Sequence, residues 1–132
     1  MTVAVDANIL VRAAARDDLQ QARAAANILR KEESIVIPIV ALCEFVWVMR
    51  QGFKMPATEI AESVRSLVES DNVVTDAPAV EAGLELIDKG GDFAAGVIAY
   101  EGRWLGAEEF VSFDKQAVAI LRSQGQKARL LS

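Results

Sequence analysis

Short apolar runs alternate with longer segments of helical periodicity along this chain, and that alternation restricts the fold more than any other feature. The expected strands are residues 2–5, 34–37, 72–75, 109–113 and 128–131. The expected helices are residues 8–15, 18–31, 39–51, 56–69, 79–89, 93–105 and 115–123. Strands that alternate with helices form a parallel sheet covered on both faces. The sequence therefore predicts an α/β fold.

Prolines and glycines mark where several expected helices begin and end. Pro38, Pro56 and Pro78 each stand at the start of a helical segment, where the fixed φ of proline fits and its missing amide hydrogen is not needed. Gly52 and Gly90 follow the ends of two segments, as helix-stopping glycines commonly do. These residues support the segment boundaries independently of the apolar periodicity.

Length and composition fit one domain over residues 1–132, because 52% of the residues are hydrophobic and can bury a core. The longest apolar run, residues 35–43, falls short of the roughly 20 residues that span a bilayer. Asp6 and Arg12 interrupt the only apolar run near the N-terminus, so no signal peptide is expected. Cys43 is the single cysteine, which excludes an intramolecular disulfide. We therefore expect a cytoplasmic protein without a membrane segment.

The chain contains no histidine, which excludes Ser–His and Cys–His mechanisms and removes the commonest zinc ligand. Its net charge of −5 argues against binding nucleic acid through a generally basic surface. Two interpretations remain: clustered carboxylates bind cations, or a basic partner covers an acidic face.

Two aspartates stand directly after expected strands. Asp6 follows the run VAV, and Asp114 follows the run FVSF. In parallel α/β sheets, ligands bind outside the carboxyl ends of the strands, so both aspartates are candidate catalytic residues. The alternative for each is local, because an aspartate in this position commonly bonds the first amides of the next helix.

Glu44 lies in the string IVALCEFVWV, where its neighbours are apolar. A lone carboxylate is costly to bury unless a cation or a hydrogen-bond donor meets it. We therefore expect Glu44 to be a catalytic residue that shares a pocket with Asp6 and Asp114. The alternative is a structural ion pair with Arg12 or Arg50.

Three further polar residues are candidates for a supporting role. Asn8 either assists the site or caps a helix, and Asp92 is typical of a helix N-cap. Ser112 precedes Asp114 by two residues on the same strand face, where its hydroxyl can donate a hydrogen bond into the site.

Carboxylates without histidine or a thiolate partner suit hard cations such as Mg²⁺ or Mn²⁺ better than zinc. Such ions lower the pKa of bound water and neutralise charge on a phosphodiester during in-line attack. A phosphatase that forms an aspartyl-phosphate is a distant alternative, because Asn8 stands where its second aspartate is needed.

Four strings resemble the PIN-domain family, and within it the VapC-type toxins of bacterial toxin–antitoxin operons: VAVDANILVR, PIVALCEFVWVM, GGDFAAGVIAYEGRWLG and EEFVSFDKQAV. They occur in the family's order and at its spacing. The resemblance implies a PIN fold, a twisted parallel sheet of about five strands flanked by helices. It also implies a metal-dependent endoribonuclease that acts on RNA, usually forms a homodimer, and pairs with a small antitoxin whose C-terminal segment enters the acidic site.

By this resemblance the first, second and fourth acids are Asp6, Glu44 and Asp114, with Asp6 and Asp114 as metal ligands. The family's third string reads like DFAD. Asp92 matches its first acid, but Ala95 stands where the metal-ligating acid is expected. Mg²⁺ or Mn²⁺ is therefore expected to bind weakly or not at all. Ala95 is either a deliberate substitution that protects an expression host, which the otherwise intact set favours, or a natural degenerate copy.

Two functions remain open. One is an RNA-cleaving toxin impaired at Ala95, and the other is a catalytically inactive PIN-fold module that binds antitoxin or RNA without cleaving. The segment around residues 39–51 has more apolar surface than one core face of a helix needs, contributed by Trp47, Val48 and Met49 with Phe45 and Phe53. This surplus favours a homodimer through the segment, and the alternative is a helix buried wholly inside the fold.

Overall fold

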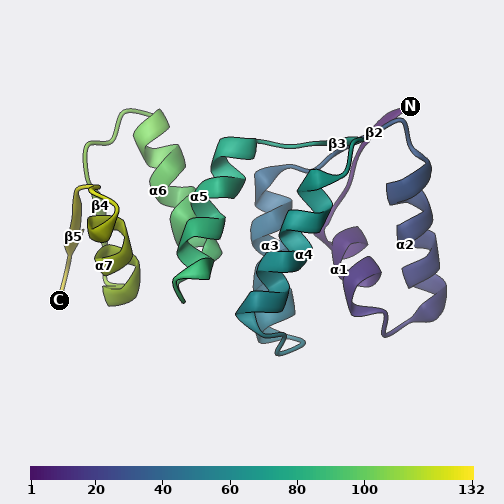
Figure 1. The fold of residues 1–132 in the computed structure, drawn as a ribbon, viewed down its shortest axis with the longest axis horizontal. Helices are drawn as coiled ribbons and strands as arrows, with labels where there is room; N and C mark the ends of the chain where they lie inside the picture. The colour runs from purple at the N-terminus through teal and green to yellow at the C-terminus, as the bar shows by residue number, and fades with distance from the viewer. The chain divides into compact units, whose positions relative to one another are not determined.

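The computed structural model describes residues 1–132 (Figure 1). Its helices are α1 (Ala7–Ala15), α2 (Leu19–Lys31), α3 (Ile39–Gln51), α4 (Ala57–Glu69), α5 (Ala77–Asp88), α6 (Phe93–Trp104) and α7 (Lys115–Ser123). Its strands are β1 (Thr2–Ala4), β2 (Ser34–Val36), β3 (Val73–Val74), β4 (Phe110–Ser112) and β5 (Ala128–Leu130). The chain divides into two compact units, Met1–Asp76 and Ala77–Ser132, and each has its own parallel sheet.

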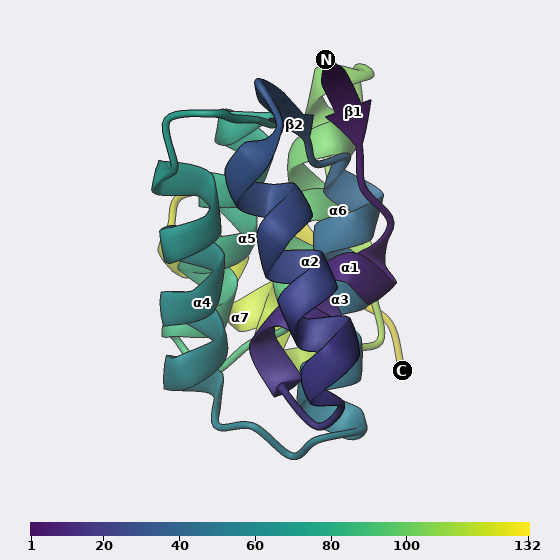
Figure 2. The ribbon, with the colours of Figure 1, turned by 90° about the vertical axis from the view of Figure 1, so that its right-hand side faces the viewer.

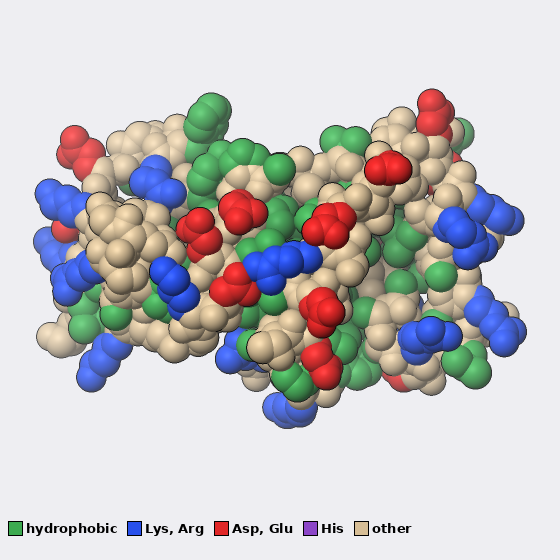
Figure 3. Space-filling view, in the orientation of Figure 1, with side chains coloured by type: hydrophobic (Ala, Val, Ile, Leu, Met, Phe, Trp, Pro, Cys, Tyr) green, Lys and Arg blue, Asp and Glu red, His purple; other side chains and the backbone are tan.

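The first unit, Met1–Asp76, is built on the sheet β1-β2-β3. Strand β2 is central: Val3 of β1 and Val73 of β3 both pair in parallel with Ile35, which is fully buried. Helix α1 packs against α2 and α3, and α3 packs against α4. Figure 2 shows α2 in front of α1, at the outer side of this unit. Lys and Arg side chains gather over α2, at the right of Figure 3.

The second unit, Ala77–Ser132, combines the helix pair α5–α6 with the sheet β4-β5 and helix α7. Two glycines let α5 and α6 approach closely. A Cβ atom on Gly96 would lie 2.3 Å from the carbonyl oxygen of Ala82, and one on Gly83 would lie 2.5 Å from the ring of Phe93. Real Cβ atoms do not tolerate such distances, so both positions require glycine for this packing.

Most expected elements are confirmed, and the helix expected at 39–51 is found as α3 without a shift. Helix α5 begins two residues earlier than expected, at Ala77, because Pro78 is tolerated within a first helical turn. Within each sheet the strands pair in parallel, but the sheets have three and two strands, so a single sheet of about five strands stays a prediction. No helix has the length and apolar character needed to cross a membrane.

Candidate active site

Asp6 lies where the expectation placed it, just beyond the carboxyl end of β1. The preceding residue, Val5, is buried, and its amide donates a 3.2 Å hydrogen bond to the carbonyl of Val36. Asp6 is exposed and caps α1, with its Oδ1 accepting from the amide of Ala7 at 2.6 Å. The local capping role is therefore confirmed. It occupies one carboxylate oxygen, Oδ1, and does not involve Oδ2.

Asp114 stands in the equivalent place after β4. Its Oδ1 accepts hydrogen bonds from the amides of Gln116 and Ala117, at 3.0 and 3.1 Å, so it caps α7. The amide of Asp114 itself donates to the Oγ of Ser112 at 3.0 Å. The Ser112 hydroxyl oxygen accepts this bond and holds the turn. Its O–H remains free to donate, so the expected hydrogen bond from Ser112 into the site stays a prediction. This turn fixes the direction in which the Asp114 carboxylate leaves the strand.

Glu44 is exposed, so the expectation that its apolar neighbours bury it is wrong. The rotation of about 100° per residue in α3 separates sequence neighbours onto different faces. Leu42 and Phe45 on either side are fully buried, whereas Glu44 lies on the exposed face with Val40 and Trp47. Arg12 and Arg50 were the alternative ion-pair partners of Glu44, and Arg12 binds Asp17 instead. Glu44 is thus a carboxylate flanked by exposed apolar side chains.

Asp92 occupies the N-cap position of α6, as expected, but its side chain makes no capping hydrogen bond. Its exposed carboxylate is therefore not held at the helix start. Ala95, one turn later, is only 8% exposed and belongs to an apolar cluster with Ala99 of the same helix and Ala117 of α7. Asn8 is exposed in the first turn of α1, facing a depression between α1 and α2.

The candidate residues are divided between the two units. Asp6, Asn8 and Glu44 belong to the first unit, and the second contains the remaining candidates, Asp92, Ala95, Ser112 and Asp114. The structure brings Ser112 and Asp114 together through a hydrogen bond. No group of three or more acidic, cysteine or histidine side chains that could hold a metal ion forms. A complete acidic site therefore remains a prediction.

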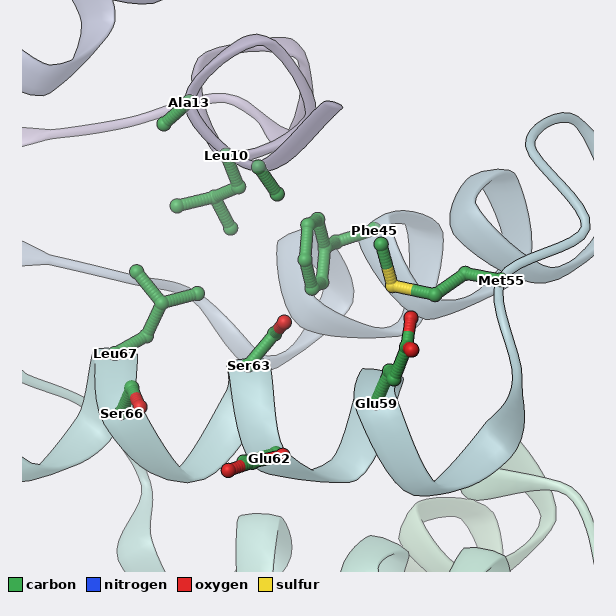
Figure 4. A pocket seen from close by; sticks show the side chains of 10 residues that line it. Leu10, Ala13, Phe45, Met55, Glu59, Glu62, Ser63, Ser66 and Leu67 are labelled. Atoms are coloured by element: carbon green, nitrogen blue, oxygen red, sulfur yellow. The ribbon is translucent and has the colours of Figure 1, made fainter. Parts of the chain in front are cut away.

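The first unit also has a groove of about 450 Å³ that contains none of the expected site residues (Figure 4). Leu10 of α1, Phe45 of α3 and Leu67 of α4 give it an apolar floor, and Figure 4 shows Glu59 of α4 pointing toward Met55. Its acidic lining is limited to two glutamates, Glu59 and Glu62 of α4. Its chemistry suits an apolar segment better than a phosphodiester.

The sequence model of the PIN domain family matches residues 3–120, so this chain belongs to the PIN domain family. The match begins in β1, ends in α7, and runs across the boundary between the two units at Asp76. The comparison with curated proteins gives no match. PIN domains are generally nucleases that use divalent metal ions such as Mg²⁺, and the α/β architecture with parallel strands is consistent with this fold.

Proposed function

We propose that this chain is a metal-dependent endoribonuclease toxin of a toxin–antitoxin pair, with its activity impaired at Ala95. The observation that carries the proposal is the placement of Asp6 and Asp114, each directly after a parallel strand, in a member of the PIN domain family. Both are positions where α/β proteins bind ligands. Because the family match spans both units, we treat residues 1–132 as one functional domain.

The proposed metal ligands are Asp6 and Asp114, with Glu44 as the second acid of the set. Carboxylate oxygens are the donors that Mg²⁺ and Mn²⁺ prefer, and the chain offers no histidine that would favour zinc. When bound, the ion supplies an activated water and neutralises charge on the RNA phosphodiester. The contribution of the chain is orientation: the capping bonds of both aspartates hold Oδ1 and leave Oδ2 as the oxygen that can bind the ion.

Ala95 accounts for the proposed impairment. A methyl group supplies neither an oxygen ligand nor a negative charge, and this one lies in an apolar cluster of the second unit. Sites for Mg²⁺ depend on few direct carboxylates, so the loss of one matters disproportionately. Asp92 is a candidate substitute, because its side chain is exposed and makes no capping bond.

The partners we propose are a small antitoxin and a second copy of the chain. The acidic composition, with a net charge of −5, suits an antitoxin segment that carries an arginine into the site. On α3, Val40 and Trp47 are 62% and 65% exposed, which supports self-association through this helix. The alternative function is a binding module that does not cleave, and the alanine at position 95 is the observation that favours it.

The test compares this chain with its Ala95→Asp variant, measuring Mn²⁺ binding by calorimetry and cleavage of total RNA. We expect the variant to bind Mn²⁺ and to cleave, and we expect Asp114→Asn in the same background to abolish both. Ala95→Asn, which has nearly the same shape without the charge, is the control and should remain inactive. Equal metal affinity and equal cleavage before and after the Ala95→Asp change would show that position 95 is not a ligand position.

A further inference from the structure

Helix α2 carries a row of arginines that the proposed active site does not use. The helix contains Arg23, Arg30 and Lys31 and no acidic residue, in a chain whose net charge is −5. Arg16, the C-cap residue of α1, precedes this helix and continues the row. All four side chains are exposed. Figure 3 shows this gathering of basic groups over α2.

The acidic residues that flank α2 are engaged elsewhere. Asp17 forms a two-oxygen ion pair with Arg12, at 2.9 and 3.0 Å. Asp18 caps α2 by accepting from the amide of Gln21. After the helix, the carboxylates of Glu32 and Glu33 lie 3.8 and 3.4 Å from the N-terminal amine. The row of arginines therefore faces solvent without a carboxylate that neutralises it.

Two surface depressions lie along this row and share its middle arginine. The first, of about 330 Å³, is lined by Arg16 and Arg23 with Leu19 and small residues of α1 and α2. The second, of about 410 Å³, is lined by Arg23 and Arg30 with Asn27 and alanines between them. Arg23 and Arg30 are seven residues apart on one helix, so they project from the same face about 10.5 Å apart along the axis.

We propose that this face of α2, with Arg16, Arg23 and Arg30, binds the phosphate backbone of single-stranded RNA; the proposal rests on the proposed function and identifies where the substrate strand is held. Guanidinium groups match phosphate oxygens in a two-point geometry. Each of the two depressions lies between two successive arginines, and this repeat suits RNA, which carries one phosphate charge per nucleotide. Both depressions are lined by alanines, whose small side chains leave room for the ribose rings. Leu19, 59% exposed, adds an apolar contact for a base.

An acidic protein segment is the competing partner for a basic face. The even spacing of Arg23 and Arg30 on one face of α2 favours RNA, because its backbone carries one phosphate per nucleotide at regular intervals. The Oδ1 of Asn27 accepts a 3.3 Å hydrogen bond from Arg30, which reduces the cost of ordering this side chain on binding an anion. Binding to RNA should also follow the salt dependence of counterion release, with a slope of about 0.7 per phosphate contact for single strands.

The experiment measures anisotropy of a labelled single-stranded RNA of about 12 nucleotides, within the range of known single-strand sites, in EDTA so that cleavage plays no part. The variant is Arg23→Gln with Arg30→Gln. The control is Arg50→Gln with Lys54→Gln, which removes the same charge from exposed positions of the same unit. Glutamine is a good helix former, so α2 should persist, and circular dichroism checks this.

We expect the α2 variant to bind at least about ten-fold more weakly, because one hydrogen bond between charged groups is typically worth that factor. The salt slope should fall by about 1.4, the value for two lost phosphate contacts. Equal weakening in the control pair, or no weakening in the α2 pair, would overturn the proposal. Stronger binding of an acidic peptide (a poly-glutamate chain) than of the RNA, lost in the α2 pair, would overturn it in favour of a protein partner.

The failure of this proposal is distinguishable from the failure of the proposed nuclease activity. If RNA binding depends on α2 but the Ala95→Asp variant does not cleave RNA, the proposed nuclease activity is refuted and the proposed RNA-binding face is supported. If the Ala95→Asp variant cleaves RNA, and replacing Arg23 and Arg30 changes neither this cleavage nor the RNA affinity, the proposed RNA-binding face is refuted and the nuclease activity is supported.

Discussion

The amide of Asp114 donates a hydrogen bond to the hydroxyl oxygen of Ser112, 3.0 Å away, at the point where β4 ends and α7 begins. The two residues come from one strand end, and the bond closes the turn between them. The same aspartate then accepts from two amides of α7. Asp114 is therefore held through its backbone amide on the strand side and through its carboxylate on the helix side.

Ser112→Ala should weaken this arrangement. We expect unfolding free energy to fall by about 0.5–1.5 kcal/mol, the usual value of one hydrogen bond. In the Ala95→Asp background, cleavage should fall by more than this stability change explains, because Asp114 loses its fixed direction. The matched control is Ser123→Ala, which removes a hydroxyl bond to the carbonyl of Ile120 at the other end of α7. Equal effects of the two variants on cleavage would show that Ser112 has no positioning role.

Gly96→Ala should destabilise the second unit. The added Cβ would meet the carbonyl oxygen of Ala82 at 2.3 Å, and overpacking of this kind typically costs about 1–3 kcal/mol. Gly102→Ala is the control in the same helix, where the nearest contact, the Cβ of Ala107, lies at an ordinary 3.8 Å. That change should stabilise by roughly 0.5–1 kcal/mol, because alanine is the better helix former. Urea unfolding of both variants measures whether the free energy of unfolding falls for Gly96→Ala and rises for Gly102→Ala.

The Arg12–Asp17 ion pair predicts a pH dependence. A hydrogen bond from Arg12 is the main cause that lowers the pKa of Asp17 below its usual 3.8. A lowered pKa in the folded state means that the pair stabilises the protein above pH 3.8, and this contribution is lost as the pH falls through the folded-state pKa. Asp17→Asn should therefore show a weaker loss of stability below pH 3.8 than the parent chain. Thermal unfolding across acidic pH measures this, with Asp71→Asn as the control.

The helices and strands could largely be predicted from the sequence, because periodicity and punctuation by proline and glycine act locally. Which face of a helix is exposed could not be read from sequence neighbours. Glu44 sits among apolar residues in the chain, yet α3 turns it outward while Phe45 turns inward. The arginine row on α2 was missed for a similar reason: its signal is the seven-residue spacing of Arg16, Arg23 and Arg30, which an overall charge of −5 conceals.

For the acids of the candidate site, too, local features could be predicted from the sequence and tertiary arrangement could not. Capping by Asp6 and Asp114 follows from their position between a strand and a helix, and both bonds are present. Asp92 has the same sequence signature but makes no capping bond, because N-cap preference is a tendency that local geometry overrides. A site assembled from residues far apart in the chain depends on packing that no local pattern encodes.

Self-association through α3 gives another prediction. Trp47→Lys should shift the protein from dimer to monomer, because a buried tryptophan at an interface is often worth about 2 kcal/mol or more, roughly 30-fold in dissociation constant. The fold should survive, since this side chain is 65% exposed. Trp104→Lys is the matched control, at a tryptophan 80% exposed in the other unit. Sedimentation analysis decides: a monomeric parent, or equal shifts for both variants, contradicts the dimer.

The Ala95→Asp change should also alter stability in a way that depends on metal. The position is 8% exposed in an apolar cluster, so in EDTA the introduced carboxylate should lower unfolding free energy by about 1–3 kcal/mol, the cost of burying an unsatisfied polar group. Ala99→Asp is the matched control, one turn later in α6 and 4% exposed in the same cluster. The Ala99→Asp variant should lose a similar amount of unfolding free energy in EDTA.

Mn²⁺ should then separate the two variants. If position 95 completes the metal site, Mn²⁺ at 100 times its dissociation constant should stabilise the Ala95→Asp protein by about 2.7 kcal/mol, since a ligand that binds only the folded state adds stability by mass action. The Ala99→Asp protein and the parent chain should not respond. Denaturant unfolding with EDTA and with Mn²⁺ measures this without any assay of cleavage. An equal response of both variants to Mn²⁺ would mean that the ion binds elsewhere and that the third acid of the set does not belong at position 95.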